Sequence, residues 1–375
     1  MQNTAKENTF MGFEYNYKPT AFTPDDSARG LLYFLLFQTV ISMFYSVLAL
    51  FEVELGVVAY LFNFLLDACF VLGVYVGTKN GKKQFLNNLK ISRDFNIAQI
   101  GLCLLLSLVC IFGFSGVTNV FLELLYSFGY NSVTSDIVIP NFGMYLVYVV
   151  FICILPAICE EIMFRGLIFN GLKRISTNFA VFGSAFLFMI MHGSPDQTVH
   201  QFILGIVLAI SLLLTNNLVI PMFIHFFNNF IAVTYTYIAY GDSVAADTGA
   251  TEIYFTQYLI YAVITFAVAC LIAGVIFSAF VKIRKKKEAE KAVGQSYEEV
   301  QVVKADTNAN INFDTGTNSF SASENAPQPE GAELMPDLTQ NRLSTSGKVM
   351  YALTITWLAI EWISALATGM GLVTI

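Results

Sequence analysis

The sequence predicts an all-α, polytopic membrane protein: an eight-helix transmembrane core plus one additional C-terminal membrane helix. Hydrophobic residues make up 56% of the chain, 35 of them Phe, and only 13% are charged. The mean hydropathy is +0.63. Apolar runs near the ~20 residues that span a bilayer recur along the chain. A soluble fold of 375 residues would not be this apolar, so the composition places the chain in a membrane.

Nine apolar runs account for the predicted helices. They lie at 31–51, 55–77, 97–125, 144–169, 178–193, 200–215, 217–240, 253–281 and 349–373. Two of them, 178–193 and 200–215, are short, and the break Gly193-Ser194-Pro195-Asp196 separates them. This break leaves open a re-entrant dip in place of two full crossings.

The basic residues predict the orientation, because cytoplasmic loops carry the excess of Lys and Arg. They precede the first run and fill the loops after the second, fourth and eighth runs: Lys6, Lys18, Arg29, Lys79, Lys82, Lys83, Lys90, Arg93, Lys173, Arg174, Lys282 and Arg284 to Lys287. The loops between them contain acidic residues and no Lys or Arg. We therefore expect an integral, multi-pass protein of the cell membrane with a cytoplasmic N-terminus.

Composition divides the chain into four parts. Residues 1–28 are polar, lack the apolar core of a signal peptide and are expected to be a cytoplasmic segment. The transmembrane core follows at 29–281. Residues 282–347, rich in Asn, Ser, Thr, Gly and Glu, are expected to form a disordered cytoplasmic linker. Residues 348–375 form the last membrane helix.

The last helix carries Glu361 between Trp357 and Trp362. One interpretation is an accessory anchor in which Glu361 meets a polar neighbour. The other is a docking helix for a protein partner.

The cysteines are expected to have a structural role, and the charge pattern argues against nucleic-acid binding. The six Cys residues all lie in apolar runs and none forms a C-x-x-C pair, so we expect buried, reduced packing residues. The only dense basic run, Arg284 to Lys287, is the expected inner-face anchor. The bilayer is therefore the expected partner, and nucleic acid is not.

Polar groups inside apolar runs are costly and mark functional sites by default. Three short clusters have this character, and their members are Glu160, Glu161 and Arg165, then Phe188 and His192, then His225 and Asn229. Residues four apart share a helix face, so Glu161 can pair with Arg165 while Glu160 points elsewhere, toward a polar cavity. His225 and Asn229 share a face for the same reason.

These side chains suffice for hydrolysis of a peptide bond. A carboxylate and an imidazole can activate a water, and further donors can hold the oxyanion that forms. Taken singly, the clusters have plainer interpretations: a buried Glu–Arg pair as structural glue and a lone His as a packing residue. His200 lacks the partner pattern and is assigned the packing role.

The order of the clusters, E-E-x-x-x-R, then F-x-x-x-H, then H-x-x-x-N on successive helices, resembles the CPBP family. This family comprises CAAX prenyl proteases of the Ras-converting type together with bacterial bacteriocin-processing and immunity proteins, including proteins like lysostaphin resistance protein A. The family region would cover about 144–240.

The resemblance implies an intramembrane endopeptidase. In it Glu160 acts as the base, and His192 works with it on the water. His225 and Asn229 stabilise the oxyanion, while Glu161, Arg165 and Phe188 support the site. The substrate would be a peptide or protein near the membrane.

A metal is the open question for this site. Glu160, His192 and His225 could form a two-His, one-carboxylate set of the kind found at catalytic zinc. However, H-x-x-x-N is not H-E-x-x-H, and a metal-bound Glu cannot also be a free base. The sequence therefore favours no cofactor, with zinc as the alternative.

Three functions remain open from the sequence. The first is an endopeptidase for CAAX-type or leader- and bacteriocin-type processing with a glutamate-activated water. The second is an immunity protein that binds a bacteriocin-like peptide without cleaving it. The third, a proton-coupled transporter, is disfavoured because the chain shows no paired halves.

Overall fold

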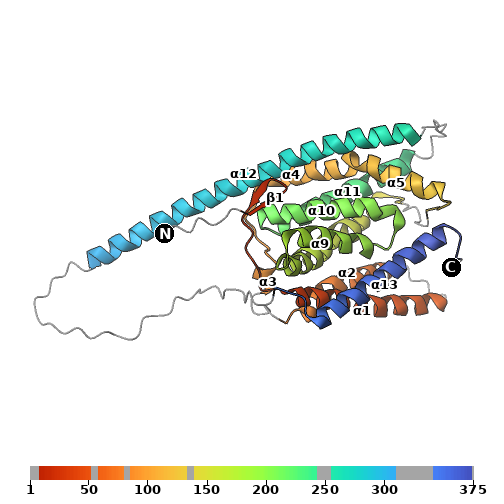
Figure 1. Ribbon diagram of the computed structural model, residues 1–375, viewed down its shortest axis with the longest axis horizontal. Coiled ribbons are helices and arrows are strands. Elements are labelled where there is room, and N and C mark those ends of the chain that lie inside the picture. Colours follow the sequence, from red (N-terminus) through yellow and green to blue (C-terminus); the bar gives the residue numbers. More distant parts are fainter. Residues whose placement is uncertain are drawn as a thin grey trace, which may run out of the picture.

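The structure is a computed structural model that describes residues 8–51, 58–79, 85–132, 139–242, 255–309 and 341–373. Apart from one two-stranded hairpin, its regular elements are helices that run side by side in a bundle (Figure 1). Seven helices in the described part are long and apolar enough to cross a membrane, and two more apolar helices are shorter. The predicted fold class, an all-α polytopic membrane protein, is confirmed.

The helices fall on the nine predicted apolar runs. Their bounds are α1 Pro24–Leu50, α2 Val58–Gly77, α4 Ile97–Leu108, α5 Ser115–Ser127, α6 Phe142–Tyr148, α7 Leu155–Glu161, α8 Asn170–Lys173, α9 Thr177–Met191, α10 Thr198–Thr215, α11 Val219–Asp242, α12 Phe255–Ala309 and α13 Thr345–Gly369. The π-helical segments η2 (Val109–Gly113), η3 (Val149–Ile154) and η4 (Ile162–Phe169) join α4 to α5 and α6 to α8. The short turns are α3 (Phe85–Asn88) and the 3₁₀ segment η5 (Pro195–Gln197).

The first helix starts earlier than its apolar run, because Thr23 and Asp26 form a capping box. The Asp26 N–H donates to Thr23 Oγ1 at 3.1 Å, and the Thr23 N–H donates to Asp26 Oδ2 at 3.0 Å. Pro24 occupies the first helical position, where its missing N–H costs nothing. The predicted segment 1–28 is therefore helical from Pro24.

The rest of that segment is partly ordered too. Strands β1 (Asn8–Phe10) and β2 (Phe13–Tyr15) pair antiparallel across Met11 and Gly12, which both have positive φ as a tight hairpin turn requires. The hairpin packs against α10 and α12. Residues 1–7 lie outside the described part.

The prediction of a disordered linker from residue 282 is wrong for its first part, since α12 continues to Ala309. The stretch after Val281 is rich in Lys, Glu and Ala, which are strong helix formers. Ion pairs four residues apart support it, Arg284 with Glu288 at 3.7 Å and Lys286 with Glu290 at 3.9 Å. Figure 1 shows this part of α12 projecting beyond the bundle. Residues 310–340 of the predicted linker lie outside the described part.

The last helix, α13, packs on α1 and contacts α9 and η5. Tyr351 Oη donates to Ser27 Oγ at 2.8 Å, and Trp362 Nε1 donates to Thr198 Oγ1 at 2.9 Å. Glu361 accepts from Trp357 Nε1 at 2.8 Å, so it has a polar neighbour as the anchor interpretation requires. A partner bound through α13 stays a prediction.

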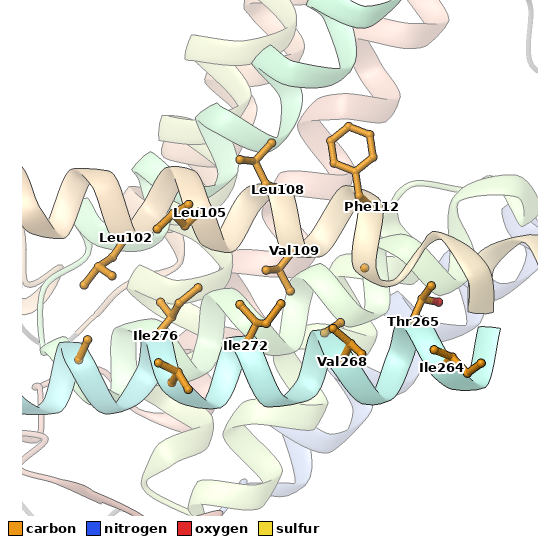
Figure 2. Close-up of a pocket in the computed structure, with 14 residues that line it drawn as sticks. Leu102, Leu105, Leu108, Val109, Phe112, Ile264, Thr265, Val268, Ile272 and Ile276 are labelled. Carbon is orange, nitrogen blue, oxygen red and sulfur yellow. The ribbon is translucent and has the colours of Figure 1, made fainter. Parts of the chain in front are cut away.

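Two further features bear on where chemistry can occur. All six Cys residues are free thiols, and five are buried; Cys270 is the exception to the predicted burial, because it lies on the exposed face of α12. A groove of about 740 Å³ lies between α12 and the α4–η2 helix (Figure 2). Its lining is aliphatic, apart from Phe112, Gly113 and Thr265, so the groove has no group for acid–base work.

Candidate active site

A cavity of about 340 Å³ inside the bundle brings four of the predicted residues together. Glu160 enters it from α7, His192 from the end of α9, and His225 and Asn229 from α11. The remaining lining residues are Ile139, Ile152, Pro156, Gln197, Gln201, Ala232, Val233 and Thr236. Three helices thus place a carboxylate, two imidazoles and an amide around one space.

Glu161 and Arg165 lie behind this cavity as a fully buried ion pair. Arg165 Nη1 donates to Glu161 Oε1 at 2.9 Å, and both side chains are 0% exposed. Arg165 Nη2 donates to the carbonyl of Gly205 at 3.0 Å. An ion pair this deep is held by its hydrogen bonds, and it fixes one carboxylate of the Glu160-Glu161 pair away from the cavity.

His225 connects the buried pair to the cavity. Its Nδ1 lies 3.0 Å from Glu161 Oε1, and its Nε2 lies 4.0 Å from Glu160 Oε2. A carboxylate oxygen accepts, so Nδ1 carries a proton and Nε2 faces Glu160. The distance of 4.0 Å is too long for a hydrogen bond, yet one water could bond to both atoms.

His192 follows the last turn of α9 and bonds to that turn. Its Nδ1 lies 2.7 Å from the carbonyl oxygen of Phe188. Because a carbonyl can only accept, Nδ1 carries a proton, and in the neutral tautomer Nε2 keeps a lone pair. His192 can therefore accept a proton from a water in the cavity.

The Phe188 ring holds the site residues in place. It packs edge-on against His192 and His225, with centroids 4.9 Å and 5.6 Å away. The Arg165 guanidinium carbon lies 4.4 Å from its ring centroid. These contacts fix the two imidazoles and the cation relative to one another.

Asn229 is oriented by a backbone carbonyl at the end of η3. Pro156 has no N–H to offer to the carbonyl four residues earlier, on Ile152. The Asn229 Nδ2 donates to this Ile152 oxygen at 2.9 Å. The second N–H of the amide remains for a ligand in the cavity.

Glu160 lines the cavity and, like Glu161 behind it, has one carboxylate oxygen without a hydrogen-bond partner in the described part of the chain. Its Oε2 is buried and has no hydrogen-bond partner among the described residues. Buried polar atoms are nearly always bonded to protein or water. The cavity beside it is large enough for water and presents the polar groups of His192, His225 and Asn229.

The donor geometry bears on the zinc alternative. Among the residues that the structure describes, no group of three His, Cys, Asp or Glu side chains gathers as metal ligands. His225 also directs Nδ1 to Glu161 and has Nε2 4.0 Å from Glu160.

Eight of the lining residues were not predicted, and Pro156, Gln197 and Gln201 are three of them. Pro156 lies in the first turn of α7, and Gln197 and Gln201 begin the helix opposite. Gln201 Nε2 donates to Gln197 Oε1 at 3.2 Å, while Gln201 Oε1 is buried without a partner in the described part. Two glutamines four apart at the start of an apolar helix were the available signal.

One comparison with known proteins bears on the activity of this chain. Residues 142–231 match the family model of type II CAAX prenyl endopeptidase Rce1-like proteins. This segment includes the four residues that were predicted to be catalytic. No curated protein and no solved structure matches the chain.

The match confirms the resemblance drawn from the three motifs and supports a CPBP-family intramembrane protease. In general terms the chain is thus an integral membrane endopeptidase of the CAAX type.

Proposed function

We propose that the protein hydrolyses a peptide bond of a membrane-associated peptide or protein with a water that Glu160 activates. The convergence of Glu160, His192, His225 and Asn229 on one cavity carries the proposal. The unpaired Oε2 of Glu160 supports it, because a base must offer a free lone pair where the water sits.

The reaction begins with proton transfer from water to Glu160. His192 Nε2 accepts a hydrogen bond from the same water. This bond orients a lone pair of the water oxygen toward the scissile carbonyl carbon. The new C–O bond forms as the carbonyl π pair moves onto oxygen. Both water hydrogens thus have an acceptor in the cavity.

The oxyanion then needs donors. Asn229 presents its second N–H, and the imidazolium form of His225 presents Nε2–H. Glu161 stabilises the His225 imidazolium through Nδ1, and Arg165 balances the charge of Glu161. Such preorganised donors are worth about 10²–10³ in rate each.

Collapse of the tetrahedral intermediate breaks the C–N bond. The protonated Glu160 gives its proton to the leaving amine and returns to the carboxylate. One water is consumed, and the products are a new C-terminal carboxyl group and a new amine.

Processing of a CAAX-type or a leader-type peptide fits this chemistry equally. The experiment that separates cleavage from mere binding compares the peptides in membranes of cells that carry the intact chain or Glu160→Gln. Glu361→Gln makes the same change at a carboxylate outside the cavity and is the matched control.

We expect uncleaved peptide to accumulate with Glu160→Gln and not with Glu361→Gln. Identical peptide profiles for the intact chain and Glu160→Gln would contradict the proposed activity and favour a binding protein. A chelator applied to the purified protein tests the zinc alternative. We expect turnover to continue in its presence.

A further inference from the structure

The cavity leads from the site toward one end of the bundle. On α11 it is lined from His225 to Thr236, a stretch of about 16 Å at 1.5 Å per residue. Ile139, before α6, and Gln197, before α10, line the same end. Tyr145 Oη and Thr234 Oγ1, 2.9 Å apart, tie the start of α6 to the last part of α11.

Hydrogen bonds show that this is also the end at which α13 stops. Tyr130 Oη donates to Asp196 Oδ2 at 2.7 Å, beside Gln197. The next residue, Asn131, donates its N–H to the carbonyl of Gly369 at 2.7 Å. Figure 1 marks the C-terminus at this end, opposite the projecting half of α12.

The other end of the site is closed by packed protein. Every residue of η4 from Ile162 to Phe169 is buried, and so is Asn170. Asn170 Nδ2 donates to the carbonyls of Arg165 and Gly166 at 3.0 Å and 2.7 Å, and its Oδ1 accepts from Tyr17 Oη at 2.6 Å.

The segment around Tyr17 forms an outer layer over this closed end. Arg174 Nη2 donates to the Thr20 carbonyl at 2.8 Å, and Arg284 Nη2 donates to the Glu14 carbonyl at 3.0 Å. A shallow hollow of about 220 Å³ near Tyr17 and Arg174 shares no lining residue with the site cavity. In the described part of the chain, packed side chains therefore cover the site at this end.

Charge assigns the two ends to the two sides of a membrane. The closed end carries Lys90, Lys173, Arg174 and Arg284, on segments that meet there; the Leu218 N–H, for example, donates to the Lys90 carbonyl at 3.0 Å. At the cavity end the described residues 128–132, 139–141 and 192–197 include no Lys or Arg, and the sequence stretches 51–57, 133–138 and 243–254 contain none either. By the positive-inside rule the closed end is cytoplasmic.

The residues that line the cavity indicate which kind of substrate it can bind. Its ionisable members are Glu160, His192 and His225, and it contains no Lys or Arg. A free C-terminal carboxylate would therefore meet no cation there, whereas the amides of Gln197 and Gln201 can bond an extended peptide backbone.

On the basis of the proposed function, we infer that the active site is entered from the membrane face opposite the basic loops. The bond that is cleaved then lies in an uncharged, membrane-proximal segment of a peptide or protein that is exposed on the extracytoplasmic side.

Cysteine labelling tests the entry side without any need for activity. Gln197→Cys places a thiol at an exposed position on the cavity lining, and Lys286→Cys places one on the exposed basic end. The unsubstituted chain is the blank. A membrane-impermeant maleimide is expected to label Gln197→Cys in intact cells and Lys286→Cys only after permeabilisation. The reverse pattern would overturn the inference.

A second experiment compares vesicles of opposite orientation from the same cells. The probe is a quenched fluorogenic peptide with an uncharged central segment and a charged tag that keeps it from crossing the bilayer. Right-side-out vesicles are expected to hydrolyse it at least tenfold faster than inside-out vesicles, and Glu160→Gln should abolish the difference.

The outcomes separate the two proposals. Faster hydrolysis by inside-out vesicles would overturn the entry side and leave the endopeptidase intact. Glu160-independent hydrolysis in both orientations, or none even in detergent, would count against the proposed activity, while the labelling result would still decide the entry side.

Discussion

Two adjacent glutamates have opposite surroundings, and this difference defines the site. Glu161 is fully buried and bonds to Arg165 and His225, whereas Glu160 reaches the cavity with a free oxygen. Successive helical residues point about 100° apart, so one turn of helix can seal one carboxylate and expose the other. The protein thereby separates a charge that orients His225 from a charge that is available to react.

Pro156 affects the direction of Asn229 through the Ile152 carbonyl, because it offers that carbonyl no N–H. Replacing it in Pro156→Ala supplies an N–H that competes for the Ile152 oxygen, so the Asn229 amide loses its fixed direction. We expect kcat to fall by between tenfold and about 100-fold, the range for small misplacements, with the thermal midpoint unchanged or raised. Steady-state kinetics together with thermal unfolding in detergent checks this. An unchanged kcat would contradict the role assigned to Pro156.

Arg165 is expected to matter for stability as well as for the site. In Arg165→Met the Glu161 carboxylate keeps only His225 as a partner in a fully buried position, and breaking such pairs costs about 3–5 kcal/mol. The thermal midpoint in detergent should drop clearly, and the double variant Glu161→Gln with Arg165→Met should recover part of the loss. Lys286→Met, at a 79% exposed side chain, is the control and should show no change. Equal midpoints for Arg165→Met and the intact chain would contradict this assignment.

Among the helices, α1 and α2 are the pair in closest contact, because glycines face one another. A Cβ on Gly77 would fall on the backbone of Gly30, and one on Gly73 would lie 2.8 Å from the Gly30 carbonyl oxygen. Small residues allow this approach in a membrane, where packing replaces the hydrophobic effect between helices. The α2 helix also contacts α7, so this pair supports the helix that carries Glu160.

Gly77→Ala should therefore be destabilising although Ala is the better helix former. The backbone of Gly30 must move, and overpacking costs about 1–3 kcal/mol. Gly101→Ala is the matched control, since a Cβ at Gly101 meets nothing within 4 Å. Thermal unfolding of the two variants side by side measures the difference. Equal midpoints would show that α1 and α2 can move apart enough to accommodate the added methyl group.

The basic half of α12, after Val281, contacts Asp94 in the turn before α4. Hydrogen bonds from Lys291 and then Lys287 hold the pKa of the Asp94 carboxyl below its usual range. A depressed pKa stabilises the folded contact above the ordinary pKa of Asp, and this stabilisation is lost as the pH falls through the lowered value. Asp94 is 44% exposed, so solvent screens the effect and keeps it small.

Hydrogen exchange over residues 285–294 reports on this contact. We expect Asp94→Asn to lower the protection of this stretch at pH 7, and the intact chain to lose its extra protection as the pH falls below the usual range for Asp. Equal protection of residues 285–294 in the intact chain and in Asp94→Asn at pH 7 would mean that Asp94 does not stabilise this part of α12.

For the molecule as a whole, the sequence predicted the features that depend on local chemistry. Apolar runs located the nine helices, and the spacing of Glu161 and Arg165 predicted their ion pair. What it could not predict depends on contacts across the chain. The direction of the cavity, the partnership of Asn229 with Ile152 and the lining role of Gln201 arise only when α7, α10 and α11 pack.

The mistaken boundaries have local causes. The polar composition after residue 281 predicted a disordered linker. The basic and acidic residues four apart there, Arg284 with Glu288 and Lys286 with Glu290, favour a helix instead. The early start of α1 was overlooked because Thr23 and Asp26 lie outside the apolar run, although their spacing is that of a capping box.

One measurement decides whether Glu160 is the base: single-turnover hydrolysis of a fluorogenic peptide by purified Glu160→Gln protein, beside Glu361→Gln. If Glu160 activates the water, its amide variant should be at least about 100-fold slower at unchanged thermal stability, while Glu361→Gln keeps the rate of the intact chain. Hydrolysis by Glu160→Gln at the rate of the intact chain would contradict the glutamate mechanism.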